Sequence, residues 1–172
     1  MSLYREIVTK AVIGKGKLNN NVSLSFPCEH KVSKTLGCWI INNDFSPVYE
    51  KGKTYIKGKC DIHVWYAYSK DSKTALFQTT HEYQEEVEVH MKNDENISET
   101  SELKAFCTKY PTCTQLRVAD GGKIYVEVEK EYSLDVIGET KLKVQVSKLA
   151  EDEWILDEEI DKNVNVEYLN KK

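Results

Sequence analysis

Apolar and polar residues alternate along most of the chain, with the period of two that is typical of β-strands. The stretch KCDIHVWYAYSK, residues 59–70, shows the pattern clearly. Read as a strand, one of its faces carries Cys60, Ile62, Val64, Tyr66 and Tyr68. The other face carries Asp61, His63, Trp65, Ala67 and Ser69. The first row predicts a buried core stripe, and the second places a tryptophan and a histidine on a face that should meet water.

The same alternation predicts a series of strands separated by turn sequences. These strands cover residues 7–13, 22–27, 38–42, 54–68, 74–90, 103–107, 114–119, 123–136 and 141–147. GKGK and NNDFSP are predicted turns, and Tyr110-Pro111-Thr112 is a predicted break because proline has no backbone N–H to donate. DGGK, residues 120–123, is the best hairpin signal, since consecutive glycines accept positive φ angles.

Long alternating strands with short turns predict an all-β fold. Glutamates at 127, 129 and 131 follow Tyr125 on one row of residues 123–136, opposite a row of isoleucine and valine. Half-buried antiparallel strands have this pattern. We predict an antiparallel, jelly-roll-like β-sandwich, with a flattened barrel as the alternative. The predicted domains are a self-assembly sandwich over 1–147 and an acidic tail over 148–172, which is either partly helical around 148–160 or an extended arm.

Length and charge narrow the class of protein. At 172 residues the chain is long enough for one full core. It has no apolar run long enough for a transmembrane helix and no apolar signal core at its start, so we expect a soluble cytoplasmic protein. Residues 149–172 hold eight acidic and three basic residues, a net charge of -5, so the remainder carries +1 of the total of -4. A nearly neutral body without a basic stripe argues against nucleic-acid binding.

No pattern of residues predicts catalysis, a cofactor or a metal. The five cysteines are an odd number, which favours reduced thiols over a disulfide framework. Cys60 and His63 lie on opposite faces of their strand and cannot share a metal ion. Cys107 and Cys113 flank the predicted break and are expected to be neighbours. No phosphate-binding or dinucleotide motif occurs, and the abundant glutamates give no specific signal for an acid–base pair.

The aromatic residues on the predicted strands have two interpretations. Six of them are suited to a protein interface or to a platform on which a sugar ring stacks: Trp39, Trp65, Tyr66, Tyr68, Tyr125 and Tyr132. Most aromatic residues in strands belong instead to the core. For Trp65 we favour a second buried layer within the subunit over contact with a neighbouring copy.

Five blocks of sequence resemble a known family when they are taken together. They are YREIVTKAV (4–12), LGCWIIN (36–42), KGKCDIHVWYAYS (57–69), SKT (72–74) and VIGETKLKVQV (136–146). In this order they resemble the CotE family, the outer spore coat morphogenetic proteins of endospore-forming bacteria. The resemblance implies a scaffold that is made in the mother-cell cytoplasm, is deposited around the forespore, associates with itself and recruits outer coat proteins. It implies no catalysis, no cofactor and no small-molecule substrate. The acidic run of 151–161 is shorter than the tail familiar in this family.

The resemblance gives the candidate residues their expected roles. Candidate assembly contacts are Trp65, His63, Trp39 and Tyr125. A candidate partner-binding tail comprises Glu151, Asp152, Glu153, Trp154, Ile155 and Leu156, since an acidic segment with an aromatic anchor often folds onto a partner. Exposed thiols at Cys28 and Cys113 are candidates for disulfides between subunits once the coat meets oxidising surroundings. The alternatives are a carbohydrate-binding β-sandwich module, which uses Trp39 or Trp65, and an uncharacterised hydrolase.

Overall fold

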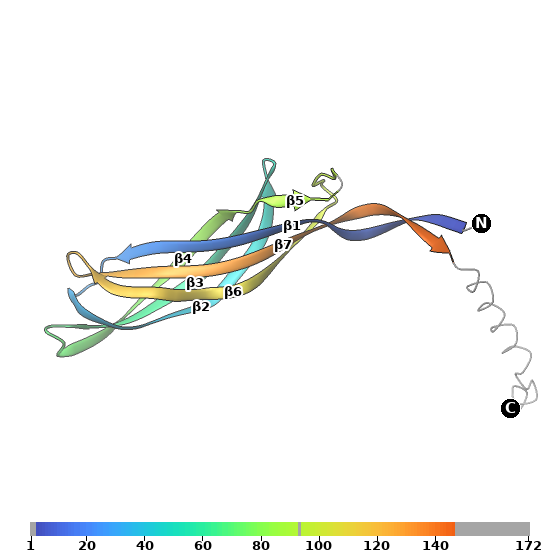
Figure 1. The fold of residues 1–172 in the computed structure, drawn as a ribbon. Coiled ribbons are helices and arrows are strands. Elements are labelled where there is room, and N and C mark those ends of the chain that lie inside the picture. Colours follow the sequence, from blue (N-terminus) through green and yellow to red (C-terminus); the bar gives the residue numbers. More distant parts are fainter. Residues whose placement is uncertain (1–2, 93, 147–172) are drawn as a thin grey trace, which may run out of the picture. The chain divides into compact units, whose positions relative to one another are not determined.

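The structure is a computed structural model, and it describes residues 3–92 and 94–146. These residues form seven strands and no helix: β1 (Leu3–Phe26), β2 (Val32–Glu50), β3 (Lys53–Tyr68), β4 (Lys73–Glu86), β5 (Val89–Met91), β6 (Glu102–Ala119) and β7 (Lys123–Val146). One sheet has the order β5-β1-β7-β6 and the other the order β2-β3-β4 (Figure 1). The sheets pack face to face, which confirms the predicted antiparallel β-sandwich.

The described residues fall into two compact units. The larger unit is Ala11–Gly138 and contains strands of both sheets. The smaller unit draws its described residues from 3–10 and 139–146, the start of β1 and the end of β7. β1 and β7 are neighbours in the sheet order and contribute residues to both units.

The core of the larger unit lies between the sheets in two clusters. The first joins Ile62 and Val64 of β3 to Ile124 and Val126 of β7. The second is built by Ile56 and Cys60 of β3, Tyr83 of β4, Val87, and Tyr132 and Leu134 of β7. Apart from Ala67, the buried members of β3 are even-numbered residues, and burial of Cys60, Ile62, Val64 and Tyr66 confirms the predicted core stripe, in which Tyr68 is half-buried. Alternation therefore assigned the inward face of both central strands correctly.

Three hairpins connect neighbouring strands. In the turn between β6 and β7, Gly121 and Gly122 have φ angles of 77° and 73°, which confirms the hairpin predicted at residues 120–123. Lys51 and Gly52 also have positive φ between β2 and β3. Residues 69–72 join β3 to β4, with positive φ at Ser69, Lys70 and Asp71.

The predicted turn at GKGK is wrong, because β1 runs through it without interruption. Gly14 and Gly16 pair with Met91 and Val89 of β5. A Cβ atom on Gly14 would lie 2.5 Å from the sulfur of Met91, and one on Gly16 would lie 2.8 Å from Val87. These glycines permit a close crossing of strands rather than a reversal of the chain.

Two further predicted breaks are β-bulges. The register between β2 and β3 shifts between Ile41 and Asp44, so NNDFSP stays within β2. The register between β6 and β7 shifts between Lys109 and Thr112, so Pro111 also stays within its strand. A bulge in an edge strand tolerates proline, since the missing N–H takes no place in the ladder. Residues 103–107 and 114–119 are therefore one strand.

Residues 74–90 divide between the two sheets, although one strand was predicted. β4 ends at Glu86 in the three-stranded sheet, and β5 begins at Val89 in the other. Val87 lies between them, where its N–H donates to the carbonyl of Thr54 at 2.8 Å and its side chain is buried. The part of the chain that the structure describes contains no helix that could cross a membrane.

Candidate assembly surface

The outer face of the β2-β3-β4 sheet gathers two of the three tryptophans. Directly opposite residues of antiparallel strands point to the same face. Trp39 of β2 lies opposite His63 of β3, which lies opposite Gln78 of β4. One row further along, Trp65 lies between Gly37 and Leu76. We call the surface around Trp39, Ile41, His63, Trp65 and Leu76 the tryptophan face.

The large side chains of the tryptophan face are open to solvent. Trp39 is 53% exposed and Trp65 is 45% exposed, and Ile41 and Leu76 are similarly open. A Cβ atom on Gly37 would lie 2.9 Å from the ring of Trp39, so the glycine makes room for the indole above it. The interpretation of Trp65 as part of a second buried layer is wrong for the part of the chain that the structure describes, because the side chain there stays 45% exposed.

Hydrogen-bonding side chains adjoin the tryptophans. The amide nitrogen of Gln78 lies 3.5 Å from both ring nitrogens of His63. The Asp61 carboxylate accepts hydrogen bonds from Asn42 at 2.8 Å and from Thr80 at 2.7 Å. These two hydrogen bonds, that of Asn42 first, lower the pKa of the Asp61 carboxyl. The polar groups beside the tryptophans are thus held in fixed directions across all three strands.

Tyr125, the fourth predicted contact, lies on the other sheet and is not part of the tryptophan face. Its hydroxyl donates to Glu127 at 2.6 Å and bonds Ser23 at 3.0 Å. The Arg117 guanidinium lies 3.8 Å from the centre of its ring. On the same outer face, Lys109 pairs with Glu129 at 2.6 Å. On this face, therefore, Lys109 and Glu129 form an ion pair, while Arg117 and Glu127 both contact Tyr125.

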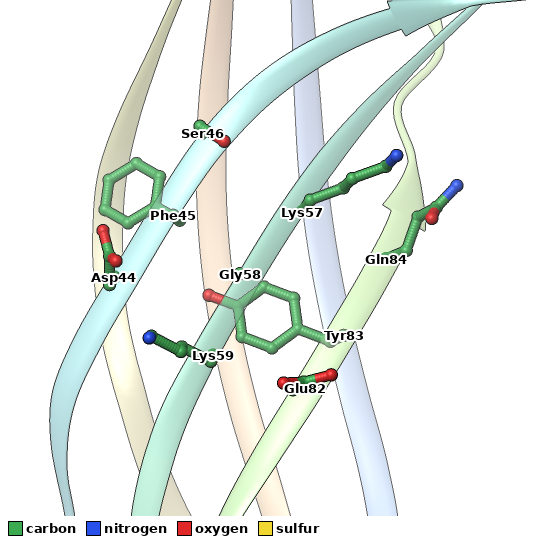
Figure 2. A pocket seen from close by; sticks show the side chains of 9 residues that line it. All are labelled: Asp44, Phe45, Ser46, Lys57, Gly58, Lys59, Glu82, Tyr83 and Gln84. Carbon is green, nitrogen blue, oxygen red and sulfur yellow. The ribbon is translucent and has the colours of Figure 1, made fainter.

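An open pocket of about 490 Å³ lies on the β2-β3-β4 sheet next to the bulge of β2 (Figure 2). Three residues from each strand line it: Asp44, Phe45, Ser46, Lys57, Gly58, Lys59, Glu82, Tyr83 and Gln84. The ring of Tyr83 lies against Gly58, where no side chain fills the space. Two lysines and two carboxylates line the pocket, so their formal charges cancel and the pocket favours neither sign of ligand.

A buried polar cluster lies between the two sheets beneath Tyr83. The side chain of Lys130 on β7 is 1% exposed, and its Nζ lies 3.4 Å from the Glu85 carboxylate and 3.5 Å from the centre of the Tyr83 ring. Burial lowers the pKa of Lys130, which Glu85 partly offsets. The Tyr83 and Tyr132 hydroxyls lie 2.5 Å apart, so one donates to the other, and they lie 2.8 Å and 3.2 Å from the Asn43 side-chain oxygen. The cluster links β2, β4 and β7 across the sandwich.

The two candidate cross-linking thiols are not exposed. Cys28 and Cys113 are half-buried and pack against the first core cluster. Desolvation raises the pKa of both thiols. The thiol of Cys113 makes a hydrogen bond with that of Cys38, whose pKa is raised to about 12, chiefly by burial. Cys107 packs against the second cluster, so the expectation that Cys107 and Cys113 are neighbours is wrong.

The predicted partner-binding tail, Glu151 to Leu156, lies outside the described residues, as does the predicted helix of 148–160. The sequence analysis did not identify Ile41 and Leu76 as surface candidates. They lie beside the tryptophans only because of the strand register, which no local sequence pattern predicts. The sequence analysis also missed the burial of Lys130, for which a signal existed. Lys130 falls on the same row of β7 as the buried Ile124, Val126 and Val128.

The fold and its surface define a class: a two-sheet β-sandwich whose smaller sheet presents an aromatic outer face. A family model described as outer spore coat protein E (CotE) matches residues 3–171. The chain belongs to this family, the outer spore coat proteins E, which confirms the resemblance of the five sequence blocks. Neither a search of curated proteins nor a search of solved structures finds a match to this chain.

Proposed function

We propose that this protein is a structural component of the outer spore coat, that it associates with itself through the tryptophan face, and that it holds other coat proteins. Membership of the outer spore coat protein E family supports the location. The observation that supports the tryptophan face as the contact surface is that Trp39 and Trp65 are both exposed on the same side of one sheet. Contiguous exposed apolar side chains on a soluble domain mark interaction sites, and tryptophan is enriched among the residues that dominate binding energy.

The composition of the tryptophan face suits a contact between proteins. Its centre holds Trp39, Ile41, Trp65 and Leu76 and no charged side chain, while Asp61 lies at one side. Protein interfaces have this arrangement of an apolar centre with polar groups at the rim. Outside the tail the chain carries a net charge of only +1, so long-range repulsion does not oppose the approach of two copies.

The other parts of the proposal follow from the family. The protein is made in the mother-cell cytoplasm and deposited on the forespore surface. Its partners are further copies of itself and other coat proteins, and it has no catalytic role, no cofactor, no small-molecule substrate, no nucleic-acid partner and no membrane insertion. The acidic segment around Trp154 is a proposed docking element for a neighbouring subunit or coat protein.

Replacing both tryptophans by alanine, Trp39→Ala with Trp65→Ala, tests the contact surface. We expect association to weaken by about 10-fold or more, since tryptophan truncation at an interface centre typically costs at least 2 kcal/mol. Sedimentation velocity over a concentration series measures the change. The thermal unfolding midpoint should stay close to that of the unaltered protein, because both side chains are exposed.

Phe106→Ala is the matched control. Phe106 is 49% exposed on β6, in the other sheet, opposite Ser133. Its truncation removes a comparable exposed aromatic ring and should leave association unchanged. Equal effects of the two alterations, or none from the tryptophan variant, would refute the tryptophan face as the contact surface.

A carbohydrate-binding module is the second candidate function, because two exposed indoles beside His63 and Asp61 also suit sugar stacking. If the protein is a carbohydrate-binding module, we expect it to stay monomeric at all concentrations and to bind glycans. Glycan binding should then be lost in Trp39→Ala or Trp65→Ala. A glycan array on the purified chain, read beside the sedimentation series, separates the two candidates.

A further inference from the structure

Two cysteines lie on the strands that form one side of the sandwich. β2 and β6 are edge strands, since the sheet orders are β2-β3-β4 and β5-β1-β7-β6. The two strands belong to different sheets and contact each other (Figure 1). The backbone N–H of Asn43 on β2 donates to the Tyr110 hydroxyl on β6 at 3.0 Å, which joins the same two edges. Cys38 lies on β2 and Cys113 lies on β6.

The strand register directs both thiols into the space between the sheets. Cys38 lies directly opposite Val64 of β3, and Cys113 lies directly opposite Val128 of β7. Directly opposite residues of antiparallel strands point to the same face. Val64 and Val128 are buried members of the first core cluster, against which both cysteines pack. There the two thiols are hydrogen-bonded to each other.

The other three cysteines have different neighbours. The sulfur of Cys28 has a hydrogen bond with the backbone of β7. Cys60 is part of the second core cluster, and Cys107 packs against that cluster. The Cys107 thiol donates to a backbone carbonyl of its own strand at 3.4 Å. Of the five thiols, those of Cys38 and Cys113 are the two that the structure brings into contact with each other.

We propose that Cys38 and Cys113 form a disulfide between the two sheets when the protein meets a low-molecular-weight disulfide such as oxidised glutathione. In the first step one protein thiolate attacks the small disulfide, forms a mixed disulfide and releases one small thiolate. In the second step the other protein thiolate attacks the mixed disulfide and releases the second small thiolate. The protein loses two electrons and two protons, and the small disulfide is reduced to two thiols.

The environment of the two thiols sets the order of these steps. Burial, followed by the charge and the hydrogen bond of Cys113, raises the pKa of Cys38 to about 12. Burial also raises the pKa of Cys113, but its hydrogen bond with Cys38 acts in the opposite direction. Because the thiolate is the attacking form, Cys113 makes the first attack and Cys38 resolves the mixed disulfide. Both thiols stay largely protonated at neutral pH, so the reaction is slow.

The disulfide staples the edge strands of the two sheets within one subunit. A cross-link that closes a long loop restricts the unfolded chain and so stabilises the folded one. The bond also consumes Cys113, which then has no thiol for a disulfide with a neighbouring copy. The inference is independent of self-association and of the tryptophan face.

Thiol counting and peptide mapping test the bond in the full-length protein. The reduced protein is incubated with oxidised glutathione at low protein concentration, and the remaining thiols are then blocked with N-ethylmaleimide in urea. We expect the number of free thiols to fall from five to three, because one bond consumes two. Trypsin should release residues 35–51 linked to residues 110–117, which contain Cys38 and Cys113. A non-reducing gel should show the oxidised protein at the monomer position.

Two alanine variants test the order of attack, and Cys28→Ala is the matched control. Cys38→Ala should trap Cys113 as a mixed disulfide with glutathione, whereas Cys113→Ala should leave Cys38 as a free thiol. Cys28→Ala removes another half-buried thiol from the first core cluster and should still give the linked peptides. Oxidation should raise the thermal unfolding midpoint of the unaltered protein by about 5–15 °C and leave that of both pair variants without this rise.

The peptide map of the unaltered protein decides the question even where a variant fails to fold. Five free thiols after oxidation, glutathione adducts without a link, or a link to another cysteine would overturn the inference. Linked peptides in a band at the dimer position place the bond between copies and overturn it as well. A mixed disulfide at Cys38 in Cys113→Ala, with none at Cys113 in Cys38→Ala, overturns the order of attack. All these outcomes leave the proposed function standing.

Discussion

Lys130 is the residue whose position is hardest to reconcile with its chemistry. An ammonium group that is 1% exposed loses its hydration, which costs several kcal/mol unless a charge and hydrogen bonds replace it. Glu85 supplies the charge at 3.4 Å, and the Tyr83 ring supplies a cation–π contact. The Glu85 side chain is 23% exposed, so it keeps contact with water when Lys130 is absent. The two partners of the pair are therefore unequal.

We expect Glu85→Gln to destabilise the protein by about 3 kcal/mol, because it leaves the Lys130 ammonium buried without a carboxylate. Lys130→Met combined with Glu85→Gln should recover most of the loss, since a buried ion pair is often replaceable by apolar residues. Urea unfolding of the single and double variants measures both effects. Equal stability of the single variant and the unaltered protein would contradict this account.

The pH dependence of the Glu85→Gln variant carries a definite sign. Burial sets the pKa of Lys130 in the folded state below its unfolded value of about 10.4. Between those two values the unfolded state binds more protons, so the free energy of unfolding rises with pH. The difference in free energy of unfolding between the unaltered protein and Glu85→Gln should therefore become smaller as the pH is raised toward 10; urea unfolding at several pH values measures it.

At the scale of elements, the glycines and bulges shape the strands. β1 and β7 each span 24 residues, and sequence signals that normally end strands lie inside β1, β2 and β6. Gly58 of β3 shows how one glycine shapes the strands beside it. A Cβ atom there would lie 2.5 Å from the ring and the hydroxyl of Tyr83 and 2.8 Å from the backbone oxygen of Asp44. The bulge of β2 and the inward Tyr83 both depend on the missing side chain.

Gly58→Ala should destabilise the sandwich by about 1–3 kcal/mol, the usual cost of overpacking a core. Tyr83 cannot move aside freely, because its hydroxyl is bonded to Tyr132 and Asn43. Gly37→Ala is the control, since the added methyl group meets only the exposed ring of Trp39 and should cost well under 1 kcal/mol. Thermal unfolding compares the two, and similar losses would show that the Tyr83 contact is not the cause.

At the scale of the whole molecule, packing of the two sheets limits solvent access to the cysteine thiols. All five cysteines are at least half-buried, and desolvation is the largest cause of a raised pKa at each one. The thiolate is the reactive form, so burial of the thiol slows both alkylation and disulfide exchange. Disulfides between subunits through Cys28 or Cys113 therefore require local opening of the fold.

We expect the folded protein to react with iodoacetamide at pH 8 at least about 10-fold more slowly than the protein in urea. Mass spectrometry of the modified peptides resolves the five sites. Rapid labelling of Cys28 or Cys113 in the folded protein would restore both as cross-linking candidates that need no opening.

Particular elements show how far the sequence predicts this structure. Alternation assigned the inward rows of β3 and β7 and the class of fold, because a strand with one buried face must repeat every two residues. The hairpin at Gly121 and Gly122 was predictable because only glycine accepts that φ without cost. The turn predicted at GKGK and the break predicted at Pro111 were wrong, because both sites lie inside strands. Glycine and proline form turns, but they also permit close strand crossings and bulges. Which of these forms depends on the neighbouring strand.

The sequence by itself determined the β-sandwich, its two core rows and the family. It also named Trp39, His63 and Trp65 as surface candidates, since local periodicity sets the direction of each side chain. The tertiary structure alone decided that these three share one face with Ile41 and Leu76, that Tyr125 lies on the other sheet, and that Lys130 meets Glu85. Those relations depend on register and on the packing of two sheets, which join residues far apart in the chain and leave no local pattern.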